Sequence, residues 1–305
     1  MVYPVFISIV ETFVIFGIGA LAWRLGMIET KDVGKLSRLT LDIFFPLLTF
    51  STITRTFDRS NLYDLWMMPL LGFGMMIFGA IIGFAAKKLM RSKGHGREAT
   101  FHHLCAVNNY VFLPLIVLQN IYDERHIALL LVMNVGSTIG LWTIGVLTLS
   151  GGGSWRSAAK SIFSVNIIAV ALAVLIVLTN IPVPEVAEYV SKYLGNATVP
   201  LMLVVIGAAL VSSLRGMLEN IYDMALLCIF RLLIIPVLAL LLLRLIPLSR
   251  EAYQVMAVVA VMPAASSSVL IAKRYGGDPD FAGRAIVITT VASLVTMPLL
   301  LGLFL

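Results

Sequence analysis

Long apolar runs, repeated along the whole chain and joined by short connections, constrain the fold more than any other feature. A helix that crosses a bilayer needs about 20 mostly apolar residues. Only 12% of the residues are charged, against about 25% in soluble domains. The sequence therefore predicts an all-α polytopic protein with ten transmembrane helices, embedded in a lipid bilayer. The ten runs, numbered in chain order, are 4–23, 36–54, 65–87, 101–119, 126–149, 160–179, 194–213, 221–245, 252–273 and 283–304.

Basic residues are unevenly divided between the connections. The connections after odd-numbered runs hold fifteen Lys and Arg residues, and those after even-numbered runs hold six. Because cytoplasmic loops are enriched in Lys and Arg, we expect a multi-pass protein of the cell (inner) membrane with the odd connections in the cytoplasm. Both termini would then lie outside. The net charge of +6 is spread over short loops, so we expect no nucleic-acid partner.

The two halves of the chain share a pattern that suggests an internal repeat. LDIFFPLL parallels GNATVPLM, so that Pro46 matches Pro200. Residues 1–150 would form a first five-helix repeat and residues 151–305 a second, with GGGSW as the hinge between them. An odd number of helices per repeat inverts the second copy in the membrane. Inverted repeats of this kind are typical of secondary transporters.

Runs 4 and 9 each contain a stretch that should interrupt a helix, namely AVNNYVFLP and VMPAASSSVL. Freed backbone groups are costly in lipid, so an interruption is tolerated where it faces a protein-lined cavity. Two such helices would cross near the midplane, and the positive N-terminal ends of their half-helices would favour a carboxylate. Alternatively, the prolines only kink the helices and the serines bond back to their own helix. The candidate substrate-binding residues here are Asn108, Asn109, Tyr110, Pro114, Pro263, Ser266, Ser267 and Ser268.

Three further polar residues inside the runs are candidates for the same site. Asp42 could face the cavity or cap a helix end. Asn134 and Thr138 are spaced i,i+4 and could extend the polar site. Alternatively, Gly136 and Gly140 form a small-residue packing face, and Asn134 joins neighbouring helices.

Two charged residues lie deep inside apolar runs, Glu11 in run 1 and Arg231 in run 8. Charges at such depth are costly and are usually functional or paired. One hypothesis is that Glu11 takes up a proton and, with Arg231, couples transport to a proton gradient. The alternative is that Glu11 reaches the membrane interface or forms a structural ion pair with Arg231.

At these motifs the sequence resembles the auxin efflux carrier family, which includes plant PIN-type carriers and bacterial organic-acid permeases. The resemblance rests on GIGALAWRLGMI, on NNYVFLPL with Asn108 and Pro114 in matching places, and on PAASSSVLIAKRYGGDPD. It implies the bile-acid-symporter-like fold, in which helices 4 and 9 are broken and cross. Helices 1, 2, 6 and 7 would form a scaffold, and helices 3–5 and 8–10 a mobile transport domain. It also implies elevator-type alternating access, organic-anion cargo and, often, a homodimer.

The sequence departs from the plant carriers in three places. It has no long central loop, so plant-type regulation is not implied. Ser268 stands where the plant crossover has a second proline, and Ile167 follows Asn166 where proline is expected. The shape of the pocket can therefore differ from that of the plant proteins.

We expect a secondary active transporter, similar to efflux carriers, of small organic anions such as auxin-like or dicarboxylic acids. The alternatives are a sodium- or proton-coupled symporter of the bile-acid-symporter type and a membrane sensor that binds an organic acid without moving it. Runs 4, 5, 9 and 10 have no central acidic residue, which argues against cation antiport. The four histidines lack metal-ligand spacing, and no catalytic or cofactor motif occurs. We expect no metal, no cofactor and no enzymatic activity.

Overall fold

The structure is a computed structural model that describes residues 2–58, 65–92, 94–150, 164–212 and 220–305. These residues form twelve continuous helices, and the sole β pairing among them is one isolated bridge. The expected hinge at 151–155 lies outside the described residues.

In the first half of the chain, several helices change pitch without ending. The first half comprises α1 (Val2–Arg24), α2 (Thr30–Leu39) continuing through the turn η1 (Thr40–Phe44) into α3 (Phe45–Thr56), α4 (Met67–Ala86) with η3 (Lys87–Leu89), α5 (His95–Ala106), α6 (Phe112–Ile121), and α7 (Glu124–Gly140) continuing through η4 (Leu141–Gly145) into α8 (Val146–Ser150).

The second half is built similarly. It comprises α10 (Val165–Thr179), α11 (Glu185–Gly195) with α12 (Thr198–Ser212), α13 (Ile221–Ile229) continuing through η5 (Phe230–Ile234) into α14 (Ile235–Leu243), α15 (Arg250–Ala260), α16 (Ser268–Arg274) and α17 (Pro279–Phe304).

Six of the described helices are long and apolar enough to cross a membrane. Ten spans were predicted, and two of the differences have a clear cause. Runs 4 and 9 are each divided into two short helices, α5 with α6 and α15 with α16. In run 6, the described helix α10 has only 15 residues. The multi-pass character is therefore clear, while the count of continuous spans is smaller than predicted.

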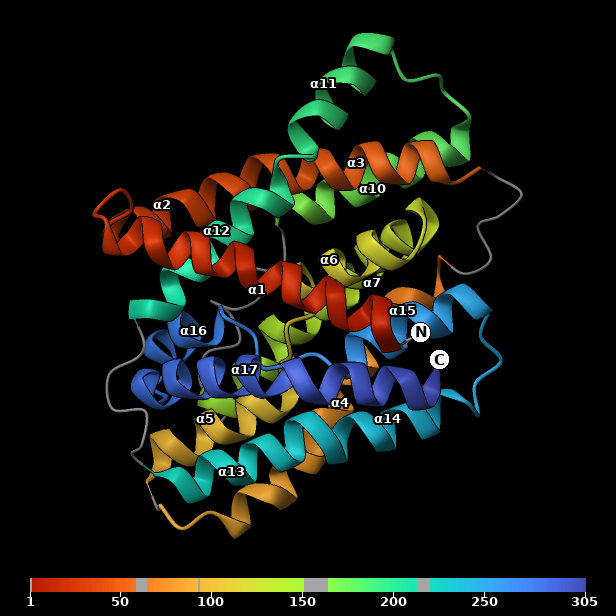
Figure 1. Cartoon of the computed structure of the whole chain (residues 1–305). Helices are drawn as coiled ribbons and strands as arrows, with labels where there is room; N and C mark the ends of the chain where they lie inside the picture. The colour runs from red at the N-terminus through yellow and green to blue at the C-terminus, as the bar shows by residue number, and fades with distance from the viewer. Residues whose placement is uncertain (1, 59–64, 93, 151–163, 213–219) are drawn as a thin grey trace.

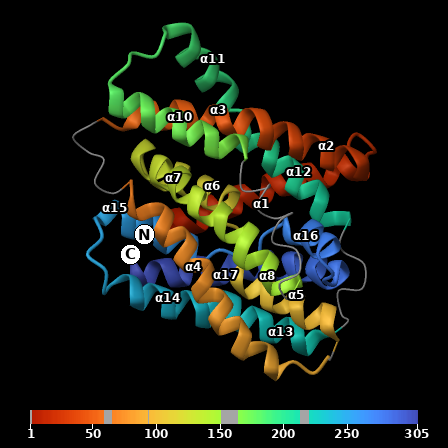
Figure 2. The same ribbon diagram turned by 180° about the vertical axis from the view of Figure 1, so that it is seen from behind.

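The helices pack as two groups (Figure 1). The first group contains α1, α2, α3, α10, α11 and α12, and the second contains α4 to α8 and α13 to α17. Figures 1 and 2 show α6 and α7 beside the first group, where they meet α1, α3 and α10, and α1 also packs directly against α17 of the second group. Both termini lie at the same end of the molecule (Figure 1).

Glycines allow the closest helix approach in the first group. A Cβ at Gly19 in α1 would overlap the backbone carbonyl of Val204 in α12, and one at Gly207 in α12 would overlap the carbonyl of Phe16. Small residues let membrane helices pack backbone to backbone, because no hydrophobic force holds them together in lipid. The α1–α12 contact therefore depends on both glycines.

The turns η1 and η5 are both π-helical, and a proline follows shortly after each of them. Each ends two residues before a proline, Pro46 after η1 and Pro236 after η5. A proline inside a helix removes one N–H donor and crowds the preceding turn, and a wider turn relieves that crowding. Such turns are frequent at functional sites. Here η1 contains Asp42 and η5 contains Arg231.

Candidate functional site

The two interrupted runs meet at their breaks. The chain leaves α5 after Ala106 and is extended at Val107, and it leaves α15 after Ala260. Asn108 and Ala264 then pair as an antiparallel bridge, and the Asn109 N–H donates to the Pro263 carbonyl at 2.7 Å. Each break therefore supplies backbone partners that the other lost when it left the helix.

Asn108 supplies a partner for a carbonyl that Pro263 leaves free. Pro263 has no N–H, so the carbonyl of Val259, four residues earlier, has no regular helical donor. The Asn108 side-chain amide donates to this carbonyl at 2.6 Å, and the Met262 N–H approaches it at 3.2 Å. Asn108 is only 1% exposed. It therefore clamps one break to the other, as well as bordering the cavity described below.

Pro114 lies in the first turn of α6, which begins at Phe112. The first four N–H groups of a helix have no helical acceptor, so a proline at this position removes no hydrogen bond. The neighbouring Leu113 N–H points to the Asn109 side-chain oxygen at 3.5 Å. Pro114 thus helps to start the half-helix, and it does not line the cavity.

Arg231 joins the C-terminal ends of α5 and α15, and it does not line the cavity. It is 1% exposed, and its guanidinium donates to the Cys105 carbonyl at 3.0 Å and to the Ala260 carbonyl at 2.9 Å. The predicted Glu11–Arg231 pair is therefore wrong. Glu11 is exposed, and its carboxylate accepts a hydrogen bond from the Asn120 side chain at 3.2 Å. The physical reason is that Arg231 has backbone carbonyls as nearer partners.

A cavity of about 370 Å³ lies beside the two breaks. Eight of the residues predicted from the sequence line it, and five do not. Those that line it are Asp42, Asn108, Asn109, Tyr110, Asn134, Thr138, Ser266 and Ser267; those that do not are Pro114, Pro263, Ser268, Glu11 and Arg231.

Ser268 faces away from the cavity because it bonds to a buried histidine. Its hydroxyl lies 3.1 Å from Nε2 of His103, and Nδ1 of His103 lies 2.8 Å from the Gly145 carbonyl. A carbonyl only accepts, so Nδ1 carries the proton and the Ser268 hydroxyl donates to Nε2. Both residues are fully buried. Ser268 therefore joins α16 to α5, and His103 extends the link to η4.

Asn134 lines the cavity, and its side-chain nitrogen is left without a hydrogen-bond partner in the described part of the chain. The Tyr110 hydroxyl is hydrogen-bonded to Thr138, and the Thr138 hydroxyl donates to the Asn134 oxygen at 2.8 Å. The Asn134 side-chain nitrogen is buried and has no partner among the described residues. Unpaired buried donors are costly and call for an explanation. A ligand that carries an acceptor would satisfy this donor.

Asn134 and Gly136 serve different faces of α7. A Cβ at Gly136 would overlap the Pro69 carbonyl of α4, and one at Gly140 would meet Met76 at 2.8 Å. Asn134 and Thr138 line the cavity instead. The glycine packing face and the cavity-lining face are both present, because successive helical residues point about 100° apart. The hydrogen-bond partner of Asn134, Thr138, lies in its own helix and not in a neighbouring one, and the role of Asn134 in substrate binding stays a prediction.

Asp42 lines the cavity from the first group of helices. Its carboxylate pairs with Arg38, one helical turn earlier, at 3.2 Å, and about half of its side chain is exposed. The pair carries no net charge, so it does not by itself exclude an anion from the cavity.

Apolar and aromatic side chains complete the lining. Sequence inspection missed them, because an aromatic residue inside an apolar run has no contrast with its neighbours. It also missed Asn166, which is 7% exposed and whose side-chain oxygen accepts from the Thr49 hydroxyl at 2.7 Å. Asn166 could have been found as a polar residue that lies two positions after Ser164, the N-cap of α10. The missed lining residues are Leu41, Phe45, Val111, Phe112, Leu141, Trp142, Ser164, Val165, Asn166, Ala265, Leu270 and Ile271.

The two half-helices that begin at the breaks differ in length. α6 has ten residues and α16 has seven, so α6 has the larger macrodipole. In the described part of the chain, no three His, Cys, Asp or Glu side chains are grouped so that they could hold a metal ion.

Comparison with known proteins agrees with this architecture. The membrane transport protein family matches residues 4–158 and 154–301. The chain is 26% identical over 296 residues to an uncharacterized transporter of Methanothermobacter thermautotrophicus, with 96% of each chain covered. It is 22% identical over 280 residues to an uncharacterized transporter of Methanocaldococcus jannaschii, with 90% of each covered. Over 121 residues it is 28% identical to Protein PIN-LIKES 1 of Arabidopsis thaliana, covering 39% of this chain and 25% of that protein. Because the family match extends over nearly the whole chain, this protein belongs to the membrane transport protein family, as its resemblance to auxin efflux carriers predicts.

Proposed function

We propose that the protein is a secondary active transporter of small organic anions in the cell membrane. The single observation that carries the proposal is the cavity beside the two breaks, which is lined by Asn134, whose side-chain nitrogen has no partner among the described residues, and by Ser266 and Ser267. Amide and hydroxyl donors suit a carboxylate, because hydrogen bonds to charged groups are the strong ones. The N-terminus of α6 adds partial positive charge at the same place.

The cavity favours a cargo with an apolar body. Phe45, Phe112 and Trp142 line it together with aliphatic side chains. A second carboxylate of a dicarboxylic acid would have to leave water for this apolar surface or approach Asp42, and burying an unpaired charge is costly. Between auxin-like and dicarboxylic acids, we therefore propose that monocarboxylates with an aromatic or aliphatic body bind better.

Two inverted five-helix repeats, 1–150 and 151–305, account for the paired breaks. The first group of helices would be the scaffold and the second group the mobile transport domain, with elevator-type alternating access. Most helix contacts lie within one group or the other, and this supports the division, although α1 also meets α6 and α17, and α3 meets α7. Ser164, at the start of α10, lines the cavity, and the Lys and Arg bias puts that helix end in the cytoplasm. We therefore propose that the cavity is entered from the cytoplasm in this state.

Uptake into proteoliposomes tests the proposal. We expect saturable uptake of indole-3-acetate and benzoate, weaker uptake of malonate, and acceleration by unlabelled indole-3-acetate inside the vesicles. Carriers show this counterflow, whereas channels do not.

Imposed proton and sodium gradients would decide whether transport is coupled to either ion. Comparison of the pH dependence of uptake between Glu11→Gln and the unaltered protein would test the predicted role of Glu11 in proton coupling. Uptake that rises linearly with concentration and shows no counterflow would contradict the carrier mechanism.

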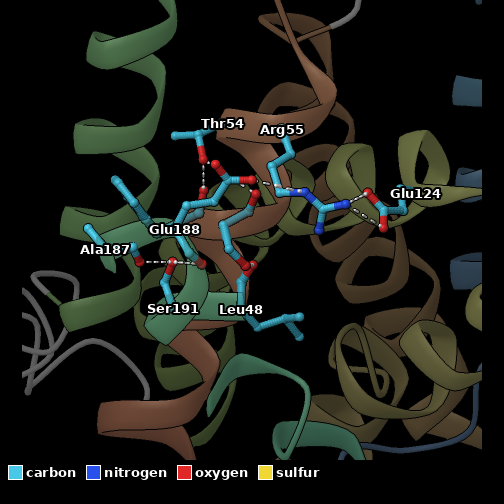
Figure 3. A network of polar contacts seen from close by, with 9 residues as sticks. Leu48, Thr54, Arg55, Glu124, Ala187, Glu188 and Ser191 are labelled. Atoms are coloured by element: carbon cyan, nitrogen blue, oxygen red, sulfur yellow. Dashed lines mark hydrogen bonds and ion pairs between the residues drawn. The ribbon is translucent and has the colours of Figure 1, made fainter. Parts of the chain in front are cut away.

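An ion-pair network joins the two groups on the side where the termini lie (Figure 3). Arg55, at the end of α3, contacts Glu124 of α7 at 3.2 Å and Glu188 of α11 at 3.6 Å. Asp123, beside Glu124 in the chain, caps α7, and the hydrogen bond from His126 lowers the pKa of the Asp123 carboxyl.

The Arg55–Glu124 ion pair connects the two groups, because α3 belongs to the first group and α7 to the second. This ion pair must therefore break when the groups move apart.

Arg55→Ala is expected to weaken this outer contact without harming the fold. Partly exposed ion pairs contribute at most about 1 kcal/mol, so the melting temperature should change little. Hydrogen exchange should become faster in the first turn of α7 and in α11, because the closed arrangement is less populated. Arg244→Ala is the control, since Arg244 contacts Tyr253 and Phe304 within the second group. Unchanged hydrogen exchange in Arg55→Ala would contradict the claim that the Arg55–Glu124 ion pair holds the two groups of helices together.

A further inference from the structure

We propose that Arg231 is a positioning residue that holds the ends of α5 and α15 together and thereby sets the geometry of the substrate cavity. The proposal rests on the transport function proposed above, and it adds a role for a residue that does not line the cavity. Arg231 is the largest fully buried side chain of the described residues. It projects from the π-helical turn η5 of a third helix.

The partners of Arg231 are carbonyls that the breaks have released. In a continuous helix, the Cys105 carbonyl would accept from the Asn109 N–H. That N–H donates instead to Pro263, in the other break. The Cys105 carbonyl therefore lacks its helical donor, and Arg231 replaces it at 3.0 Å.

The same holds for the second break. The Ala260 carbonyl would accept from the Ala264 N–H in a continuous helix. That N–H points to the Thr289 hydroxyl of α17 at 3.4 Å. Arg231 supplies the replacement through its other terminal nitrogen at 2.9 Å. One guanidinium thus satisfies one released carbonyl from each half of the chain.

The positive charge of Arg231 also offsets the repulsion between the C-terminal ends of α5 and α15. The C-terminal end of a helix carries about half a negative charge, and here two such ends face each other. Without a cation between them, α5 and α15 would repel each other in a medium of low dielectric constant. In the described part of the chain, Arg231 forms no ion pair with an acidic side chain, so the two helix ends balance its charge.

The link to the cavity is short. The chain leaves Cys105 and reaches the lining residue Asn109 four positions later, and it leaves Ala260 and reaches Ser266 six positions later. If the helix ends separate, the Asn108–Ala264 bridge between them opens. The donors of the cavity then lose their common orientation, although the cavity itself contains no atom of Arg231.

Arginine is suited to this role and lysine is not. The planar guanidinium presents donors in a rigid fork, and its two terminal nitrogens reach two carbonyls at once. A lysine ammonium is a compact charge on a flexible chain. Arg231→Lys therefore keeps the charge but holds at most one helix end well, while Arg231→Met removes both contacts at similar volume.

The test compares the full-length protein with Arg231→Lys, Arg231→Met and the control Arg244→Met, in which a contact of Arg244 with Tyr253 is lost. With indole-3-acetate as the probe, we expect folded Arg231→Lys to raise the KM of uptake at least tenfold, while the maximal rate per folded molecule falls less than threefold. The control should keep the KM of the unaltered protein. A residue that only supported the fold would reduce the amount of folded protein and leave the KM of the remainder unchanged.

Hydrogen exchange gives a readout that needs no substrate. In Arg231→Lys, amides at 107–111 and 261–267 should exchange at least tenfold faster, while those of the α1–α12 contact should not change. Should Arg231→Met fail to fold, Arg231→Lys carries the test. A normal KM together with normal exchange at both breaks would overturn the proposal. If the unaltered protein takes up no probe, the proposed function fails, and exchange alone decides the role of Arg231.

Discussion

Gly136→Ala is expected to destabilise the protein severely, by roughly 3 kcal/mol or more, which is the upper end for overpacking. The added Cβ would overlap the carbonyl of Pro69, a backbone atom of α4 that no change of rotamer can move away. The helices α4 and α7 would have to separate along their whole contact. Melting of the purified protein in detergent, followed by size-exclusion chromatography, measures the loss of folded material.

Gly74→Ala is the matched control for this substitution. Gly74 lies in α4 itself, and a Cβ at that position would meet no atom within 4 Å. Alanine there should leave the melting temperature unchanged or raise it slightly, since glycine inside a helix costs up to about 1 kcal/mol relative to alanine. Equal melting temperatures for the two variants would show that α4 and α7 do not pack backbone to backbone at Gly136.

The breaks could be predicted from the sequence because their cause is local. A proline removes a particular N–H, and two adjacent amides inside an apolar run have no place in a continuous helix that faces lipid. Those two facts locate the interruptions to within a few residues. They also identify Asn108, Asn109, Ser266 and Ser267, all of which line the cavity.

Other features of the site depend on which distant atoms meet, and no local pattern reveals them. Every residue has a carbonyl, so nothing in the sequence marks those of Cys105 and Ala260 as the partners of Arg231. The chain also changes conformation within the run of serines: Ser266 and Ser267 lie in a turn, and Ser268 is the first residue of α16, so the three side chains do not all face one cavity. Ser268 faces His103, which lies 165 positions earlier in the chain.

The largest effect on transport is expected at Asn134. Asn134 lines the cavity, and its side-chain nitrogen has no partner among the described residues, so we expect a bound carboxylate to accept from it. Asn134→Leu removes a hydrogen bond to a charged group, which contributes about 1.5–3 kcal/mol, and should raise the KM for indole-3-acetate roughly tenfold to a hundredfold. Asn134→Asp should abolish uptake, because it also places a negative charge against the anionic cargo in a low-dielectric site.

The fold should survive both substitutions, because Asn134 is joined to the rest of α7 by a single side-chain hydrogen bond, from Thr138. Ser137→Ala provides the control, since Ser137 is equally buried on the same helix and its hydroxyl lies against α4 rather than the cavity. That variant should transport normally. A loss in Asn134→Leu would come from the missing donor. Since aspartate keeps the size of asparagine and an oxygen toward Thr138, a larger loss in Asn134→Asp would come from the missing donor together with the added negative charge. Uptake by Asn134→Asp at the rate of the unaltered protein would mean that no anion binds at this amide.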